Sequence, residues 1–286
     1  MRFTVLGSTG FIGSHVAELA KSQGHEVVCP KRDEPLRGRD LGHVIYAIGI
    51  TADFRRRPHD TVTAHVTKLQ EVLTQASFET LVYLSSTRVY SRCVPNTATA
   101  DRIHAVSETM PIPVLSSDFS DLYNLSKLLG ESIAISHGPN VRVARLSNVV
   151  GPDFESDNFL TSVLRDCVKS GNAVLRSSLD SAKDYVSVDD VASVLVRLGP
   201  EGRSSIYNVA SGCQTTNGEI VAVLARLMGA SISITPGSPT YRFPPIDIGL
   251  VTSELGFAPR PIEAILPRLI EEFHRHNGLP TRREVV

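Results

Sequence analysis

Tyr123 and Lys127 are the residues whose types and spacing most directly suggest chemistry in this 286-residue chain. They lie four positions apart in the run Asp-Leu-Tyr-Asn-Leu-Ser-Lys-Leu-Leu-Gly-Glu (residues 121–131), and on a helix this spacing places them one turn apart on one face. The leucines of the run recur at helical period on another side, so we expect the helix to bury them. An ammonium beside a phenol lowers the phenol's pKa from its usual value of about 10 and makes it a useful acid or base near neutral pH. The alternative is an ordinary surface helix that carries one tyrosine and one lysine.

A glycine-rich turn near the N-terminus predicts a nucleotide-binding site. An apolar run (Arg2–Leu6) is followed by the pattern GxxGxxG, and then by residues 14–23 with helical periodicity. In such a strand–turn–helix unit the glycines let the backbone approach a pyrophosphate, which lies at the helix N-terminus. Because the commoner spacing is GxGxxG, the prediction depends mainly on the fact that this pattern directly follows the first predicted strand. The expected cofactor contacts in this turn are Gly7, Thr9, Gly10, Phe11, Ile12 and Gly13.

The segment after the second predicted strand (residues 26–29) favours NADP over NAD. An acid normally ends this strand and binds the ribose 2′-hydroxyl, but here Lys31 and Arg32 come first and Asp33 follows them. Two cations suit a 2′-phosphate; the alternative is that they belong to a polar loop. Only residues 31–43 separate this strand from the next one (residues 44–48), which is close to the minimum for a parallel crossover. We therefore expect no full helix between these strands and an open or unusual adenine side.

Hydroxyl side chains follow the predicted buried strand at residues 80–84. Ser85, Ser86 and Thr87 stand at the carboxyl end of a central strand, where open α/β sheets bind ligands. The alternative is a serine cluster that caps the next element. Residues 92–119 contain three prolines and many serines and threonines, which indicates a long loop of the kind that forms lids or binding segments.

The order of elements predicts an α/β fold. Strand-like runs alternate with helical patterns along the chain, which is typical of a parallel sheet with helices on both faces. Further helices are expected at residues 59–76, 158–170, 216–228 and 262–274, and further strands at residues 141–146 and 205–209.

Composition and charge exclude several classes of protein. The formal net charge of −1 argues against a nucleic-acid surface, and the basic run at residues 55–57 is interpreted as a solvated face. Hydrophobic residues make up 42% of the chain, ample for a core but too interspersed with charge to span a membrane. The four cysteines lie far apart without metal-ligand spacing, so we expect free thiols, no metal site and a cytoplasmic protein.

Several motifs together resemble the extended short-chain dehydrogenase/reductase superfamily, in particular its NAD(P)-dependent nucleotide-sugar epimerases, dehydratases and reductases. The resemblance covers nearly the whole chain and implies a Rossmann-type doubly wound parallel sheet with a smaller C-terminal α/β substrate-binding domain. It further implies a dinucleotide-binding domain of residues 1–150 and about 184–212, and a substrate-binding domain of residues 151–183 and about 213–286. The motifs are Gly7-x-x-Gly10-x-x-Gly13, Ser85-Ser86-x-x-Val89-Tyr90, Tyr123-x-x-x-Lys127, Arg145-Leu-x-Asn148-Val-x-Gly151-Pro152, Lys183-Asp-Tyr-Val-x-Val-Asp-Asp190-Val-Ala and Tyr207-Asn-Val-Ala-Ser-Gly212.

The resemblance assigns expected roles to individual residues. Tyr123 is the expected acid/base, Lys127 is expected to hold the nicotinamide ribose, and Ser86 to hydrogen-bond the reacting sugar oxygen. Ala47 and Gly49 are expected to border the cofactor. The expected substrate contacts are Ser86, Thr87, Arg88, Asn148, Lys183 and Arg242, the last three near the phosphates.

Departures from the family pattern narrow the expected reaction. Dehydratases of this superfamily place Asp-Glu directly after the catalytic Ser or Thr, whereas Thr87 and Arg88 stand here, which disfavours dehydration. The favoured function is an NADP-dependent reduction of a nucleotide-linked 4-keto sugar. The alternatives are a nucleotide-sugar 4-epimerase with tightly bound NAD and a non-catalytic NAD(P)-binding regulatory protein. The resemblance also implies a homodimer that pairs helices near residues 59–76 and 122–137.

Overall fold

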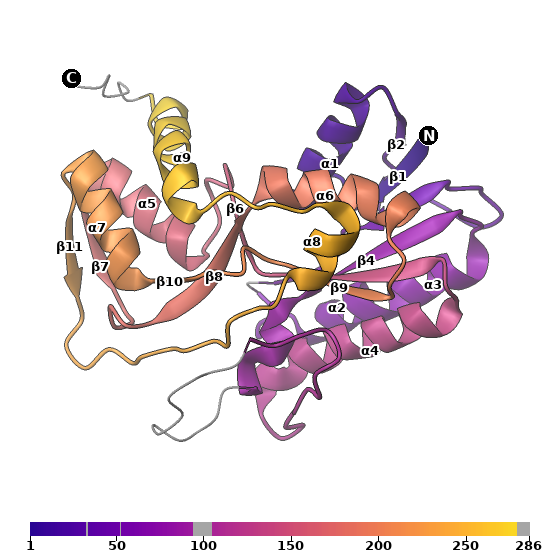
Figure 1. Ribbon diagram of the computed structural model, residues 1–286, viewed down its shortest axis with the longest axis horizontal. Helices are drawn as coiled ribbons and strands as arrows, with labels where there is room; N and C mark the ends of the chain where they lie inside the picture. Colours follow the sequence, from indigo (N-terminus) through magenta and orange to yellow (C-terminus); the bar gives the residue numbers. More distant parts are fainter. Residues whose placement is uncertain (33, 52, 94–104, 279–286) are drawn as a thin grey trace.

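Six parallel strands form the central sheet of the computed structural model, which describes residues 1–32, 34–51, 53–93 and 105–278 (Figure 1). Their order in space is β2-β1-β3-β4-β5-β9, and every neighbouring pair is parallel. Two predicted segments include residues that the structure does not describe: the loop at residues 92–119 and the C-terminal domain. The bounds are β1 (Arg2–Leu6), β2 (Glu26–Val28), β3 (His43–Tyr46), β4 (Thr80–Ser86), β5 (Val141–Leu146) and β9 (Ile206–Val209).

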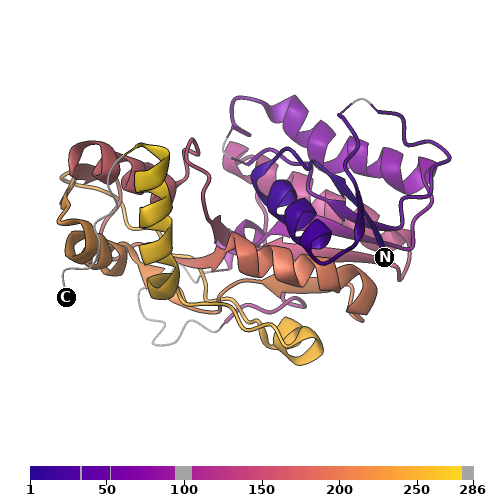
Figure 2. The same cartoon turned by 90° about the horizontal axis from the view of Figure 1, so that it is seen from above.

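Helices cover both faces of this sheet, as Figure 2 shows from above. One apolar cluster joins the sheet to α1 (Phe11–Ser22), α6 (Val188–Glu201) and α8 (Gly249–Leu255). Another joins the opposite face to α3 (Lys68–Gln75) and α4 (Leu122–His137). Successive residues of a strand alternate between the faces, so Val82 faces the first cluster and Tyr83 the second. The predicted doubly wound α/β fold is confirmed.

The connection between β2 and β3 is short and contains no helix among its described residues. It crosses β1, so β3 pairs with β1 and β2 is left as an edge strand. The common doubly wound sheet has a third strand outside the second, and here the chain passes directly to the other side of β1. The expectation that a full helix is missing is confirmed, and the edge beside β2 is open.

A second, smaller region lies at the carboxyl end of the sheet (Figure 1). Its apolar cluster joins three helices to two short parallel strands. After this region the chain returns to the large sheet, because α8 packs against β9 and α6. The elements are β6 (Asn148–Val150), α5 (Phe159–Ser170), β7 (Asn172–Leu175), β8 (Ala182–Ser187), β10 (Gln214–Thr216), α7 (Asn217–Met228), β11 (Ser231–Ile234) and α9 (Ile262–His276). No described helix is both long and apolar enough to cross a membrane.

The helix expected at residues 59–76 contains a π-helical turn. It runs as α2 (Pro58–Val62), a π turn (Thr63–Thr67) and α3 without a break. Such turns are rare and occur mostly at functional sites. This one places His65, a fully buried side chain, against α4.

The expectation that α4 buries its leucines is wrong. Tyr123, Ser126, Lys127 and Glu131 are buried, whereas Leu129 is 51% exposed and the other leucines of the run are only partly buried. The buried face is polar because it borders the carboxyl ends of the strands, where a cavity lies and hydrogen-bond partners are available.

Candidate active site

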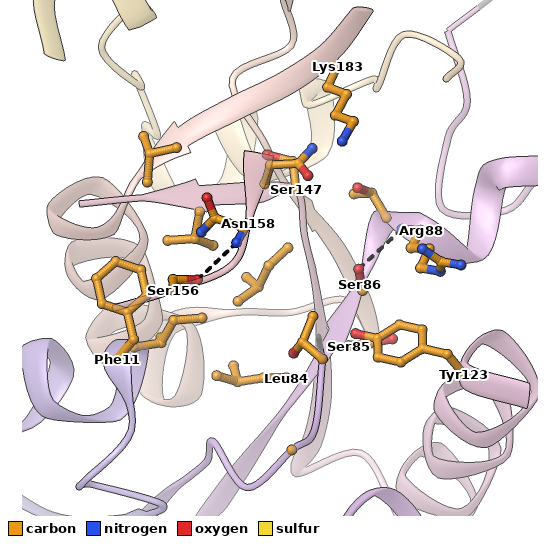
Figure 3. Close-up of a pocket in the computed structure, with 18 of the residues that line it drawn as sticks. Phe11, Leu84, Ser85, Ser86, Arg88, Tyr123, Ser147, Ser156, Asn158 and Lys183 are labelled. Atoms are coloured by element: carbon orange, nitrogen blue, oxygen red, sulfur yellow. Dashed lines mark hydrogen bonds between the residues drawn. The ribbon is translucent and has the colours of Figure 1, made fainter. Parts of the chain in front are cut away.

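A cavity of about 750 Å³ opens at the carboxyl ends of β1, β3, β4 and β5. Its walls come from the glycine turn, the segment after β3, the end of β4, α4, and the first part of α5 with β8. Figure 3 shows Tyr123 and Ser86 on one side and Phe11, Ser156 and Asn158 on the other. The size suits a ligand larger than a simple sugar.

The glycine turn after β1 has room for backbone only. A Cβ on Gly7, which has a φ of +86°, would lie 2.8 Å from the backbone of Ala47, and a Cβ on Gly13 would lie 2.3 Å from the carbonyl oxygen of Gly7. At the N-terminus of α1, Gly10 supplies no side-chain cap and the first turn carries no acid. Free N–H groups and the helix dipole at such an end bind anions. The turn therefore fits the pyrophosphate of a dinucleotide.

Replacing Gly13 by alanine is expected to weaken cofactor binding at least tenfold, because the new Cβ forces the turn away from α1. Titration of the purified variant with NADPH, followed by cofactor fluorescence, measures the change. Gly218→Ala is the matched control, since its Cβ would meet only ordinary contacts of 3.6 Å or more. Equal loss in both variants, or none in Gly13→Ala, would contradict the assignment.

Tyr123, Ser86 and Lys127 converge on the cavity from two elements. Tyr123 and Lys127 extend from α4, and Ser86 ends β4. The Ser86 hydroxyl accepts a hydrogen bond of 3.2 Å from the backbone N–H of Arg88, which fixes its position. Lys127 donates from Nζ to the carbonyl oxygen of Leu84 at 2.8 Å. The three groups that the sequence predicted as a set therefore lie along one wall.

The electrostatics of Tyr123 differ from the sequence-based expectation. Burial raises the pKa of Tyr123, while the Ser86 hydroxyl, the Arg88 guanidinium and the Thr51 hydroxyl lower it in part. The Lys127 ammonium bonds to Leu84 and lies over the ring of Tyr83, 5.0 Å from the ring centre. The pKa of Tyr123 is therefore raised and not lowered as expected, and the cation that partly offsets its burial is Arg88.

Lys127 is expected to give the reaction a transition near neutral pH. Burial lowers the pKa of Lys127 to about 7, although Glu131 partly offsets the effect. The ammonium is therefore present below pH 7 and lost above it, so kcat/KM is expected to fall as pH rises through about 7. In Lys127→Arg the charge persists and this fall should vanish, even if the rate is lower. The same transition in both proteins would contradict the role of Lys127.

His65 was not predicted from the sequence, and its ring hydrogen-bonds both to the segment after β3 and to α4. The Ile50 N–H donates to His65 Nε2 (3.2 Å), so Nδ1 carries the proton and donates to Ser126 Oγ (2.8 Å). Ser126 donates in turn to the carbonyl oxygen of Tyr123 (2.8 Å). Burial, and then Lys127, lower the pKa of His65 to about 2, so the ring stays neutral. The buried residues Leu69 and Val72 lie four and seven positions after His65, a helical spacing that places residue 65 on the buried face and could have pointed to it.

Phe54 was also missed, and no sequence motif marks it. Its ring is buried and lies 5.5 Å from that of Tyr123, centre to centre. The guanidinium of Arg88 lies over both rings, 5.2 Å from the centre of Phe54 and 5.7 Å from that of Tyr123. The segment after β3 therefore contributes an aromatic wall beside the acid/base candidate.

The remaining predicted residues divide into two groups. Those that line the cavity are Gly10, Phe11, Ile12, Gly13, Ala47, Gly49, Thr87, Arg88, Asn148 and Lys183. The other group lies outside the lining residues; in it Gly7 is partly buried, and the exposed members are Thr9, Lys31, Arg32 and Arg242. The structure therefore does not bring Arg242 to the cavity, and its neighbours Phe243 and Pro244 line it instead.

Four lining residues have buried polar atoms without a hydrogen-bond partner among the described residues. They are Arg88 Nε, the Ser147 hydroxyl, the Tyr185 hydroxyl and Gln214 Oε1. Buried polar groups are normally hydrogen-bonded, so these atoms mark where a polar ligand would complete the cavity. The described residues contain no cluster of three or more His, Cys, Asp or Glu that could hold a metal ion.

The protein has a doubly wound α/β fold. Its cavity at the carboxyl ends of the strands brings Tyr123 and Lys127 together with a glycine turn that fits a dinucleotide pyrophosphate. The model of the NAD dependent epimerase/dehydratase family matches residues 3–58 and 43–210. The chain belongs to this family, and the suspected superfamily is thereby confirmed.

Two curated relatives are nucleotide-sugar enzymes. The dTDP-glucose 4,6-dehydratase of Streptomyces griseus is 27% identical over 170 residues, which cover 54% of this chain and about half (51%) of that protein. UDP-glucuronic acid decarboxylase 6 of Arabidopsis thaliana is 24% identical, with 99% of this chain and 91% of the relative covered. Membership of the NAD dependent epimerase/dehydratase family classes this chain as an enzyme, and both of these relatives are named for reactions of nucleotide-linked sugars.

Solved structures share the fold. MoeE5 in complex with UDP-glucose and NAD has a TM-score of 0.78 at 21% identity, covering 97% of this chain and 100% of that one. RMD from Pseudomonas aeruginosa, complexed with NADPH, has a TM-score of 0.77 at 23% identity, covering 96% and 99%. Proteins with this fold thus bind either nicotinamide cofactor.

Proposed function

We propose that the protein is an NADP-dependent reductase of a nucleotide-linked 4-keto sugar, with Tyr123 as acid/base. The observation that supports this most is the convergence of Tyr123, Ser86 and Lys127 on one cavity that the glycine turn also borders. When bound, the cofactor supplies the hydride; the protein supplies orientation and electrostatics.

The side chains have separate tasks in this proposal. Ser86 hydrogen-bonds the sugar oxygen, and Tyr123 gives the proton that this oxygen gains as the carbonyl becomes a hydroxyl. Lys127 holds the nicotinamide ribose through the donors that its bond to Leu84 leaves free. Lys183 and Asn148 line the cavity from β8 and β6, where the diphosphate would extend.

The end of β4 supports reduction over dehydration. Elimination of water needs an acid and a base close to the sugar. The residues after Ser86 are Thr87 and Arg88, and neither is a carboxylic acid. Reduction of a ketone needs only one proton donor, and Tyr123 supplies it.

The open edge beside β2 supports a cofactor that exchanges during turnover. The described residues that line the cavity include none between β2 and β3, so the adenine side is little enclosed. Lys31 and Arg32 are exposed there, free to reach a 2′-phosphate. If NADPH and NADH bind equally, and the double variant Lys31→Ala/Arg32→Ala changes neither affinity, the NADP preference is wrong.

A 4-epimerase is the alternative, because the same three residues serve it and it would keep NAD bound. The test is to denature the purified protein and measure the released cofactor, then to add NADPH with 4-keto nucleotide sugars. A reductase releases little NAD and consumes NADPH. Stoichiometric NAD with interconversion of UDP-hexoses would establish the epimerase instead.

We also propose a homodimer through α2, α3 and α4. Leu129 on α4 and Val62 on α2 are exposed, and exposed apolar side chains on neighbouring helices suit an interface. Light scattering of wild type and Leu129→Glu tests this, since the variant is expected to be monomeric.

A further inference from the structure

Arg88 is a cation in the cavity whose Nε–H finds no acceptor among the described residues. Its Nε is buried without a hydrogen-bond partner among the described residues. Asp118 and Asp121 lie near enough to raise its pKa, but both pair with Arg92, and Asp121 does so at 2.5 Å. Arg88 as a whole is partly buried, but a buried N–H without an acceptor costs free energy, so we expect a ligand to supply the acceptor that the described residues do not.

The surrounding residues hold the guanidinium in place. Its planar group lies over the rings of Phe54 and Tyr123, and both rings are buried. Stacking of this kind leaves the N–H donors at the edge of the group free for a planar, bidentate acceptor. Figure 3 shows Arg88 beside Ser86 and Tyr123, on the wall where the reacting oxygen is expected.

Several cations of the cavity lining lie around Arg88. Its described lining contains five cations (Arg55, Arg56, Arg88, Lys127, Lys183) and four acids (Asp53, Asp153, Asp157, Asp184). Of the acids, Asp184 already accepts two hydrogen bonds from Ser211. Burial, and then Arg55, lower the pKa of Arg88, and burial followed by Arg88 lowers that of Lys183, so these cations lie close together.

We propose that Arg88 binds a carboxylate carried by the sugar, on the carbon next to the one whose oxygen faces Tyr123. The substrate is then a nucleotide-linked uronate. This rests on the proposed function, because it places the reacting oxygen at Tyr123, and it adds the chemical class of the sugar. A carboxylate is planar and accepts two parallel hydrogen bonds from a guanidinium.

Isothermal titration with α-D-glucuronic acid 1-phosphate and α-D-glucose 1-phosphate tests the proposal without assuming a nucleobase. The wild type, with and without NADP, is expected to bind the uronate at least tenfold more tightly. Arg88→Gln should remove this preference by weakening the uronate alone, and Arg88→Lys should retain part of it. Arg56→Gln, which removes a cation from the exposed rim of the same cavity, is the matched control and should keep the preference.

Three outcomes would overturn the proposal: equal affinity of the wild type for the two phosphates or no detectable binding of the uronate, a preference that survives in Arg88→Gln, or an equal loss in Arg56→Gln. The last would assign the preference to the general charge of the cavity. Unchanged melting temperatures of the variants show that they fold. Because no turnover is measured, failure here leaves NADPH-dependent reduction of a neutral keto sugar to be tested separately.

Discussion

Tyr123→Phe is expected to lower kcat/KM by about 10²–10⁴-fold, the usual contribution of a positioned acid or base. The substitution removes one hydroxyl and keeps the ring packed against Phe54 and His65. Cofactor affinity and melting temperature should therefore stay close to those of the wild type. The measurement is the rate of NADPH oxidation with the keto sugar that the wild type reduces.

The exposed tyrosine Tyr241 provides the control for this substitution. Its side chain lies outside the cavity lining, so Tyr241→Phe should change kcat/KM by less than about twofold. A Tyr123→Phe enzyme with near wild-type kcat/KM would remove Tyr123 from the chemistry, whatever the other residues do.

Breaking the buried ion pair between Glu131 and Arg145 is expected to cost about 3–5 kcal/mol in the free energy of unfolding. Both side chains are 4% exposed, and Arg145 Nη2 lies 2.6 Å from Glu131 Oε2. Ser85 donates to the same carboxylate, and Arg145 also donates to the Tyr90 hydroxyl, so one substitution leaves several groups unpaired. Urea unfolding of Glu131→Leu measures the loss.

A double-mutant cycle separates the interaction energy of the two charges from the free-energy cost of leaving one of them buried without its partner. Glu131→Leu combined with Arg145→Met removes both charges, so the double variant should lose less than the sum of the single ones. The exposed pair Arg197–Glu201 is the control, and Glu201→Gln should cost less than about 1 kcal/mol. A single-variant cost as small as that of Glu201→Gln would contradict a structural role for the buried pair.

The main elements of the fold could be predicted because local signals agree with it. The strands Arg2–Leu6 and Val141–Leu146 match their predicted bounds, since each is a short segment rich in apolar residues that ends at a small residue, Gly7 or Ser147. The helix over residues 217–228 also matches within one residue, because Thr216 and Glu219 form a capping box that a sequence pattern can locate.

Other features depend on contacts that spacing alone does not encode. The leucines of α4 were expected inside, but the cavity and the Glu131–Arg145 pair provide partners that favour its polar face instead. The position of β3 beside β1 follows from how the chain crosses the sheet, which a strand pattern does not specify. Phe54 and Arg88 meet only because the segments after β3 and β4 converge, and Arg242 matched a family expectation but lies at the surface.

Transfer of deuterium from [4-²H]NADPH to a 4-keto nucleotide sugar tests the central claim most directly. The protein is incubated with the labelled cofactor and each candidate keto sugar, and the products are analysed by mass spectrometry. The proposed function predicts a hydroxy sugar one mass unit heavier than the unlabelled product, formed by the wild type and not by Tyr123→Phe. Interconversion of UDP-hexoses without added NADPH, together with no deuterium in any product from the keto sugars, would contradict it.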